Sequence, residues 1–210
     1  MILGQDGVSS GAIYALLALA LVLIFSVTRV IFIPQGEFVA FGALTLAMLQ
    51  AGKVPATVWL LVAMGAIVAA IDGLARLRDR DTDGLASLLG WNLAYPLALA
   101  ALLHAVEPGG LPMALQILLT LAILVPLGPM IYRIAYQPIA ETSVLVLLIA
   151  SVAVHLILTG LGLVFFGAEG ARTAPFSEGS LNFGEVSINL QTLWVVGCSL
   201  AFIFGLAAFF

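Results

Sequence analysis

Charge is the scarcest feature of this sequence. Only 9% of the 210 residues are charged, against about 25% in a typical soluble domain. Hydrophobic residues make up 63% of the chain, and the mean hydropathy is +1.21. This imbalance excludes an ordinary soluble domain and indicates an integral membrane protein. With seven Lys and Arg residues in all, the chain also has no basic face for nucleic acid.

Residues that build most catalytic and metal sites are also rare. The single cysteine, Cys198, excludes an intrachain disulfide, and the apolar run around it favours a packing role. His104 and His155 are the only histidines, and no Cys, Asp or Glu cluster stands at metal-ligand spacing. The only lysine, Lys53, follows no glycine-rich phosphate-binding loop. We therefore predict that the chain is not an enzyme and carries no cofactor or metal of its own.

Long apolar runs are what the sequence does contain. A helix that crosses a bilayer needs about 20 mostly apolar residues. Seven segments approach or exceed that length, at about 9–28, 30–50, 55–71, 86–106, 113–132, 143–166 and 191–210. Pro126 and Pro129 predict a bend or a frayed turn near the end of the fifth segment. The sequence thus predicts an all-α protein, a polytopic transmembrane helix bundle of about seven spans in one domain, 1–210.

The few basic residues predict the orientation of this bundle. Cytoplasmic loops carry an excess of Lys and Arg. Lys53 and Arg172 fall on one side of the predicted spans, and five arginines fall on the other: Arg29, Arg76, Arg78, Arg80 and Arg133. We therefore expect the N-terminus outside, a cytoplasmic loop at 72–85 and an extracytoplasmic loop at 167–190. Alternation at Val186, Ile188 and Leu190 predicts a short strand in that outer loop.

The second predicted span contains a carboxylate behind two helix breakers, in the run Pro34, Gln35, Gly36 and Glu37. If the segment were helical, Glu37 would lie roughly 12 Å past Arg29. Pro34 removes a backbone donor and clashes with the turn before it, so we expect a break near Ile33. Glu37 would then stand at the positive end of a half-helix, as in the broken helices that line many transporter paths. Either it caps the half-helix and pairs with a neighbouring donor, or it contacts a substrate amine.

A second polar feature lies in the sixth predicted span. Ser151, His155 and Thr159 recur every four residues, so they share one helix face. In lipid that face must point into the protein. Interhelical hydrogen bonding, at about 0.6 kcal/mol per contact, is one explanation. A path-lining role for His155 is the other.

Two blocks of sequence carry a family pattern. The first reads SGAIYALLALAL at 10–21, VI at 30–31 and GEF at 36–38, and the second reads AYQPI at 135–139 and LLIAS at 147–151. These blocks resemble the LivH-type permeases, the membrane subunits of branched-chain amino acid ABC importers. The family signature reads G-x-x-Y-A-L-x-A-x-G-L and V-I-N-F-A-H-G-E, with A/V-Y-R-P-L further on. The resemblance covers about 8–50 and 130–167.

The chain departs from this family pattern at four points. FIPQ at 32–35 stands where the family has N-F-A-H, and Gln137 replaces the usual arginine. Three predicted spans, where the family has one, separate Glu37 from Pro138. Family permeases also continue beyond a helix like 191–210, so we expect that the sequence is truncated and represents the N-terminal portion of the permease domain.

The resemblance implies a multi-pass permease subunit of a bacterial inner membrane. It would carry branched-chain amino acids or related small amides or acids, while separate ABC ATPase subunits bind ATP. A second permease subunit, a periplasmic solute-binding protein and membrane lipid would be its other partners. The candidate path or gate residues are Pro34, Gln35, Gly36, Glu37, Ser151, His155 and Thr159. The alternative is a non-transporting membrane scaffold or assembly subunit in which Glu37 is purely structural.

Overall fold

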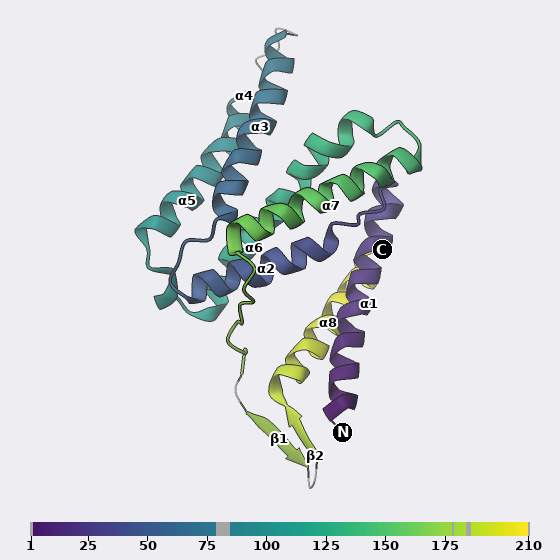
Figure 1. The fold of residues 1–210 in the computed structure, drawn as a ribbon, viewed down its shortest axis with the longest axis vertical. Helices are drawn as coiled ribbons and strands as arrows, with labels where there is room; N and C mark the ends of the chain where they lie inside the picture. Colours follow the sequence, from purple (N-terminus) through teal and green to yellow (C-terminus); the bar gives the residue numbers. More distant parts are fainter. Residues whose placement is uncertain (1, 79–84, 178, 184–185, 210) are drawn as a thin grey trace. The chain divides into compact units, whose positions relative to one another are not determined.

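The computed structural model describes residues 2–78, 85–177, 179–183 and 186–209. This part of the chain is almost wholly helical, as the sequence predicts (Figure 1). The chain divides into two compact units. We call residues 1–35 with 174–210 the terminal unit, and residues 36–173 the central unit.

The terminal unit pairs the first long helix with the last one. Helix α1 (Ile2–Thr28) packs against α8 (Leu190–Phe209). Strands β1 (Ser180–Phe183) and β2 (Val186–Asn189) form an antiparallel hairpin directly before α8, with Leu181 opposite Ile188 (Figure 1). The short strand expected in the outer loop is therefore confirmed, and it has a partner strand.

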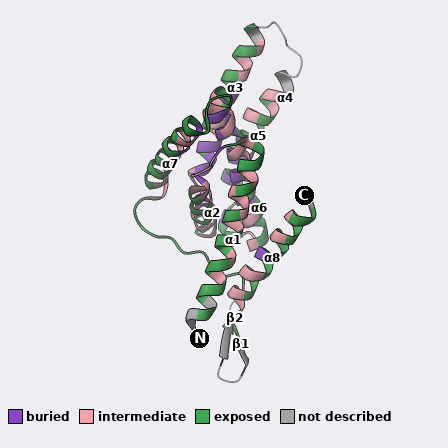
Figure 2. Ribbon diagram, turned by 90° about the vertical axis from the view of Figure 1, so that its right-hand side faces the viewer, coloured by how far each residue is buried: buried purple, intermediate pink, exposed green. Residues whose placement is uncertain are grey.

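The central unit is a bundle of helices. Its main elements are α2 (Gln35–Gln50), α3 (Thr57–Arg78), α4 (Leu85–Leu89), α5 (Tyr95–Ala105), α6 (Met113–Ile131) and α7 (Val144–Phe166). Short turns of other helix types join them: the π-helical η1 (Gly90–Ala94) and η3 (Tyr132–Tyr136), and the 3-10 turns η2 (Pro108–Gly110) and η4 (Gln137–Ile139). Figure 2 shows the buried residues gathered between these helices, while α7 is largely exposed. Leu61, Ile123 and Leu147 are central members of this core.

Six of the described helices are long and apolar enough to cross a membrane. Their spanning segments are Asp6–Thr28, Thr57–Arg76, Ser87–Ala105, Met113–Ile139, Val144–Phe166 and Leu190–Ala208. Helix α2 has 16 residues, which makes it about 24 Å long at 1.5 Å per residue, less than the roughly 30 Å of a hydrocarbon core. The expected number of about seven spans is thus corrected to six helices of spanning length. The fold is that of a multi-pass membrane protein, and the outside position of the N-terminus stays a prediction.

The segment expected as a cytoplasmic loop at 72–85 is partly helical. Helix α3 continues to Arg78, so Asp72 and the residues after it extend the helix. Residues 79–84 lie outside the described part of the chain. Charged residues did not end α3 because a helix can carry them on an exposed turn.

All three tryptophans lie near the beginning of a spanning segment. Trp59 is the third residue of α3, Trp91 is the fifth residue of the segment that begins at Ser87, and Trp194 is the fifth residue of α8. Each has an exposed side chain. Tryptophan is enriched at the membrane–water interface, where its ring is half apolar and half polar. This placement supports the spanning assignment of these three segments.

Helix α6 passes through two prolines without ending. It runs to Ile131, and only at Tyr132 does the pattern change to the π-helical turn η3. Pro126 has no N–H, so it leaves the carbonyl of Ala122 without its usual helical donor. The hydroxyl of Tyr95 donates to that carbonyl at 2.8 Å. The change of helix type at Tyr132 lies near the end of the fifth predicted segment, and another helix supplies the donor that Pro126 lacks.

The carbonyl oxygen of Asn92, in the π-helical turn η1, lies against α3. That oxygen faces Gly65 so closely that a Cβ on Gly65 would overlap it, and the same Cβ would lie 3.4 Å from the Pro96 ring. Only glycine therefore fits at this crossing of α3 and η1.

Candidate functional site

The predicted break before Glu37 is confirmed. Residues 29–34 are not helical, and α2 begins at Gln35, directly after Pro34. Arg29, the residue after α1, has a positive φ of 58° and so turns the chain out of the helix. Gly36 lies inside the first turn of α2 and does not interrupt it, so of the two predicted helix breakers only Pro34 lies at the break. Glu37 also lies in that first turn, where the helix dipole favours a negative charge.

Glu37 meets the polar face of α7 inside the central unit. The imidazole Nδ1 of His155 lies 2.7 Å from Oε1 of Glu37. The hydroxyl of Thr159 lies 3.5 Å from the same oxygen and donates to the carbonyl of His155 at 2.9 Å. The fold thus brings together the half-helix and the polar stripe, two features that the sequence places more than 100 residues apart.

This pair is only partly satisfied. The side chain of Glu37 is 16% exposed and that of His155 is 36% exposed. Neither Nδ1 of His155 nor Oε2 of Glu37 makes a hydrogen bond to the described residues, although both atoms are buried. The contact therefore has the distance of an ion pair without the alignment of a hydrogen bond, and one carboxylate oxygen has no partner.

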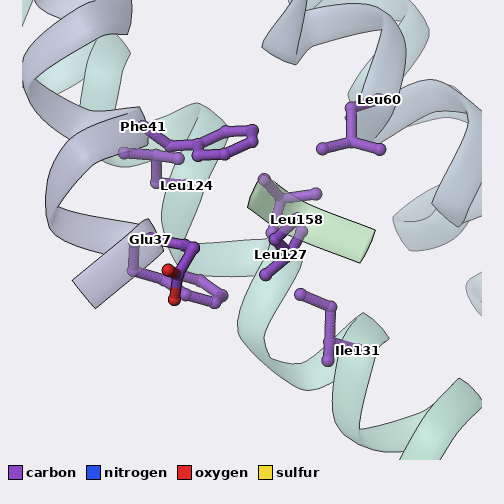
Figure 3. Close-up of a pocket in the computed structure, with 8 residues that line it drawn as sticks. Glu37, Phe41, Leu60, Leu124, Leu127, Ile131 and Leu158 are labelled. Carbon is purple, nitrogen blue, oxygen red and sulfur yellow. The ribbon is translucent and has the colours of Figure 1, made fainter. Parts of the chain in front are cut away.

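A small cavity borders Glu37. Its volume is about 10 Å³, room for about one water molecule. Its other lining residues are all apolar: Phe38, Phe41, Leu60, Leu124, Leu127, Ile131 and Leu158 (Figure 3). In the conformation described, the cavity is far too small for an amino acid, so solute could pass only if these side chains moved.

Other predicted site residues lie elsewhere. Ser151 is fully buried and accepts a hydrogen bond from the hydroxyl of Tyr136 at 3.1 Å. Pro34 and Gln35 belong to the terminal unit, and Gly36 is the first residue of the central unit. Tyr136 was missed as a polar partner, although a tyrosine within an apolar span needs a partner for its hydroxyl.

One ion pair was not predicted from the sequence. Arg133 in η3 donates through Nε to Oδ1 of Asp72 on α3 at 2.8 Å, and its Nη2 contacts the same oxygen. Both side chains are partly buried. The sequence places these residues 61 positions apart, and no local pattern relates them. The pair joins α3 to η3, the turn that follows α6, and each charge reduces the cost of burying the other.

Two further observations bear on the class of site. No group of three or more His, Cys, Asp or Glu residues in the described part of the chain is arranged to hold a metal ion. Comparisons with protein-family models, with curated proteins and with solved structures find no match for the chain. Function therefore has to be argued from the fold and from the Glu37 site.

Proposed function

We propose that this chain is a permease subunit of an ABC importer, and that Glu37 and His155 belong to its solute path or gate. One observation carries the proposal: the short helix α2, which follows a break in the chain, has a carboxylate in its first turn that meets a histidine on a spanning helix. Ionisable side chains inside a membrane are costly, and they generally face an interior or an aqueous path. Short helices that begin at membrane depth are a recurring element of transporter binding sites.

The partners and the solute class come from the sequence resemblance. The proposed solutes are branched-chain amino acids or related small amides or acids. Separate ABC ATPase subunits, a second permease subunit and a periplasmic solute-binding protein complete the proposed importer in a bacterial inner membrane. The bias of basic residues supports an outside N-terminus.

The proposed transport requires the cavity beside Glu37 to become larger. About 10 Å³ beside Glu37 admits no solute, so α2, α6 and α7 must separate during transport. Alternating access includes a closed state of this kind, in which neither side of the membrane reaches the site. The Glu37–His155 contact joins α2 to α7, so it is well placed to hold the closed state.

Replacement of Glu37 by glutamine tests this role, because it removes the charge and keeps the shape. The chain would be co-expressed with the proposed ABC ATPase and permease partners, and leucine uptake and solute-stimulated ATP hydrolysis would be measured. We expect Glu37→Gln to lower both. Glu141→Gln is the matched control, because Glu141 is exposed between η4 and α7. Unchanged uptake and coupling in Glu37→Gln would remove the proposed role.

The second candidate function is a membrane scaffold without transport. It is favoured by the small, apolar cavity beside Glu37, which a purely structural ion pair would also produce. A scaffold needs no ATPase. Failure of the chain to co-purify with any ATP-binding subunit would therefore favour it, and a stable complex would count against it.

A further inference from the structure

A larger hollow opens on the surface of the central unit beside the Glu37 cavity. Its volume is about 250 Å³. Residues of α3, α7 and the end of α6 with η3 line it: Leu60, Met64, Ile67, Ile131, Ile134, Ala135, Val154, Ile157, Leu158 and Leu161. Every lining residue is apolar, and Ile67 and Ile157 are exposed at its mouth. We call this hollow the α3–α7 groove.

The groove and the Glu37 cavity share one wall. Leu60, Ile131 and Leu158 line both. In Figure 3, Leu158 lies between Glu37 on one side and Leu60 and Ile131 on the other. A change of rotamer at Leu158 would therefore join the two hollows. The joined site would have a long apolar part that ends at a carboxylate.

The chemistry of this joined lining selects one kind of ligand. Glu37 is the only charged residue that lines either hollow, and no basic side chain does so in the part of the chain that the structure describes. Its Oε2 is buried and lacks a hydrogen-bond donor. His155 already lies against Oε1 and lines neither hollow. A cationic ligand would supply the missing donor, whereas the carboxylate of a zwitterion would be buried without a partner, at high cost.

We propose that the α3–α7 groove and the Glu37 cavity form a binding site for a small apolar amine. Its alkyl body lies in the groove, and its ammonium group donates to Oε2 of Glu37. This inference rests on the proposed function for its site, and it adds an order of preference: the site binds an amine without a carboxylate more tightly than the amino acids, amides or acids of that function. Binding requires Leu158 to move aside.

Three probes of similar shape and different head group test the proposal: isopentylamine, isovaleramide and leucine. Binding to the whole chain in lipid nanodiscs would be measured by saturation-transfer NMR, with empty nanodiscs subtracted. We expect isopentylamine to bind most tightly. Because a charge-assisted hydrogen bond would be lost, Glu37→Gln should weaken amine binding by about tenfold or more. Glu141→Gln should leave it unchanged.

Leu158→Ala tests the shared wall, because it removes the side chain that divides the hollows. It should strengthen amine binding, and unchanged binding would contradict a joined site. Leucine or isovaleramide binding as tightly as the amine to the unaltered chain would overturn the proposal without any variant. All binding is measured without ATPase subunits. A failure of amine binding is therefore distinct from a failure of the ATPase co-purification that tests the permease function.

Discussion

The close crossing of α3 over η1 leads to a quantitative prediction for Gly65→Ala. A Cβ at Gly65 would overlap the carbonyl oxygen of Asn92. This obstacle is backbone within the π-helical turn η1, so it cannot rotate away as a flexible side chain would. Pro96 lies behind it, with its ring 3.4 Å from the added carbon. Relief of the overlap therefore requires α3 and η1 to move apart.

Two contributions of opposite sign determine how Gly65→Ala changes the free energy of unfolding. Alanine is favoured over glycine within a helix by about 1 kcal/mol. An extra carbon in a packed core costs about 1–3 kcal/mol, occasionally more. Because the obstacle at Gly65 is backbone, we expect a cost at the upper end of that range. The net expectation is a loss of about 2 kcal/mol or more in the free energy of unfolding.

Gly73→Ala on the same helix provides the matched control. Nothing lies within 4 Å of a Cβ added at Gly73, so only the helix propensity acts, and the variant should gain up to about 1 kcal/mol. Both variants would be unfolded with SDS in mixed micelles and followed by far-UV circular dichroism. If Gly65→Ala proved as stable as Gly73→Ala, the close approach of α3 to η1 would be refuted.

Two further interactions give predictions of the same kind. Tyr95→Phe leaves the Ala122 carbonyl without a donor and should cost about 1–3 kcal/mol in unfolding free energy; Pro126→Ala restores a backbone N–H, so in its presence Tyr95→Phe should cost much less. Equal costs in the two backgrounds would contradict this account. Asp72→Asn leaves the charge of Arg133 partly buried and unpaired; because the side chains of Arg133 and Asp72 are 34% and 18% exposed, the loss in unfolding free energy should be about 1–2 kcal/mol, between the values for exposed and buried pairs. Exchanging the two residues should recover part of that loss, and a further loss would count against a direct pair.

Much of the helix pattern could be predicted because lipid dictates it. A span needs a minimum number of apolar residues whatever its neighbours are. The segment predicted at 143–166 is α7 (Val144–Phe166), and the one predicted at 113–132 begins at Met113 and ends at Ile131. The break at Pro34 was also predictable, since it depends on local backbone sterics.

Predictions from hydropathy were wrong where the backbone conformation, or a partner distant in the sequence, determines the structure. Residues 30–50 are apolar enough for a span, but hydropathy counts residues and does not register that helix begins only at Gln35. Asp72 was assigned to a loop because it is charged. In the fold it remains in α3, where it pairs with Arg133 from η3. The Glu37–His155 contact was likewise beyond reach, because helical spacing on α7 predicts a polar face without its partner.

Two contacts at the junction of η1 with α5 have a consequence for the Glu37 site. In lipid, a freed backbone carbonyl has no water to bind, and the Ala122 carbonyl on α6 accepts its hydrogen bond from the hydroxyl of Tyr95, directly after η1. The carbonyl of Asn92 in η1 packs closely against Gly65 on α3. The junction of η1 with α5 therefore fixes α3 against α6, the helices that carry Leu60 and Ile131 of the shared wall. A variant that loosens this junction, such as Tyr95→Phe, should alter amine binding although Tyr95 lines neither hollow.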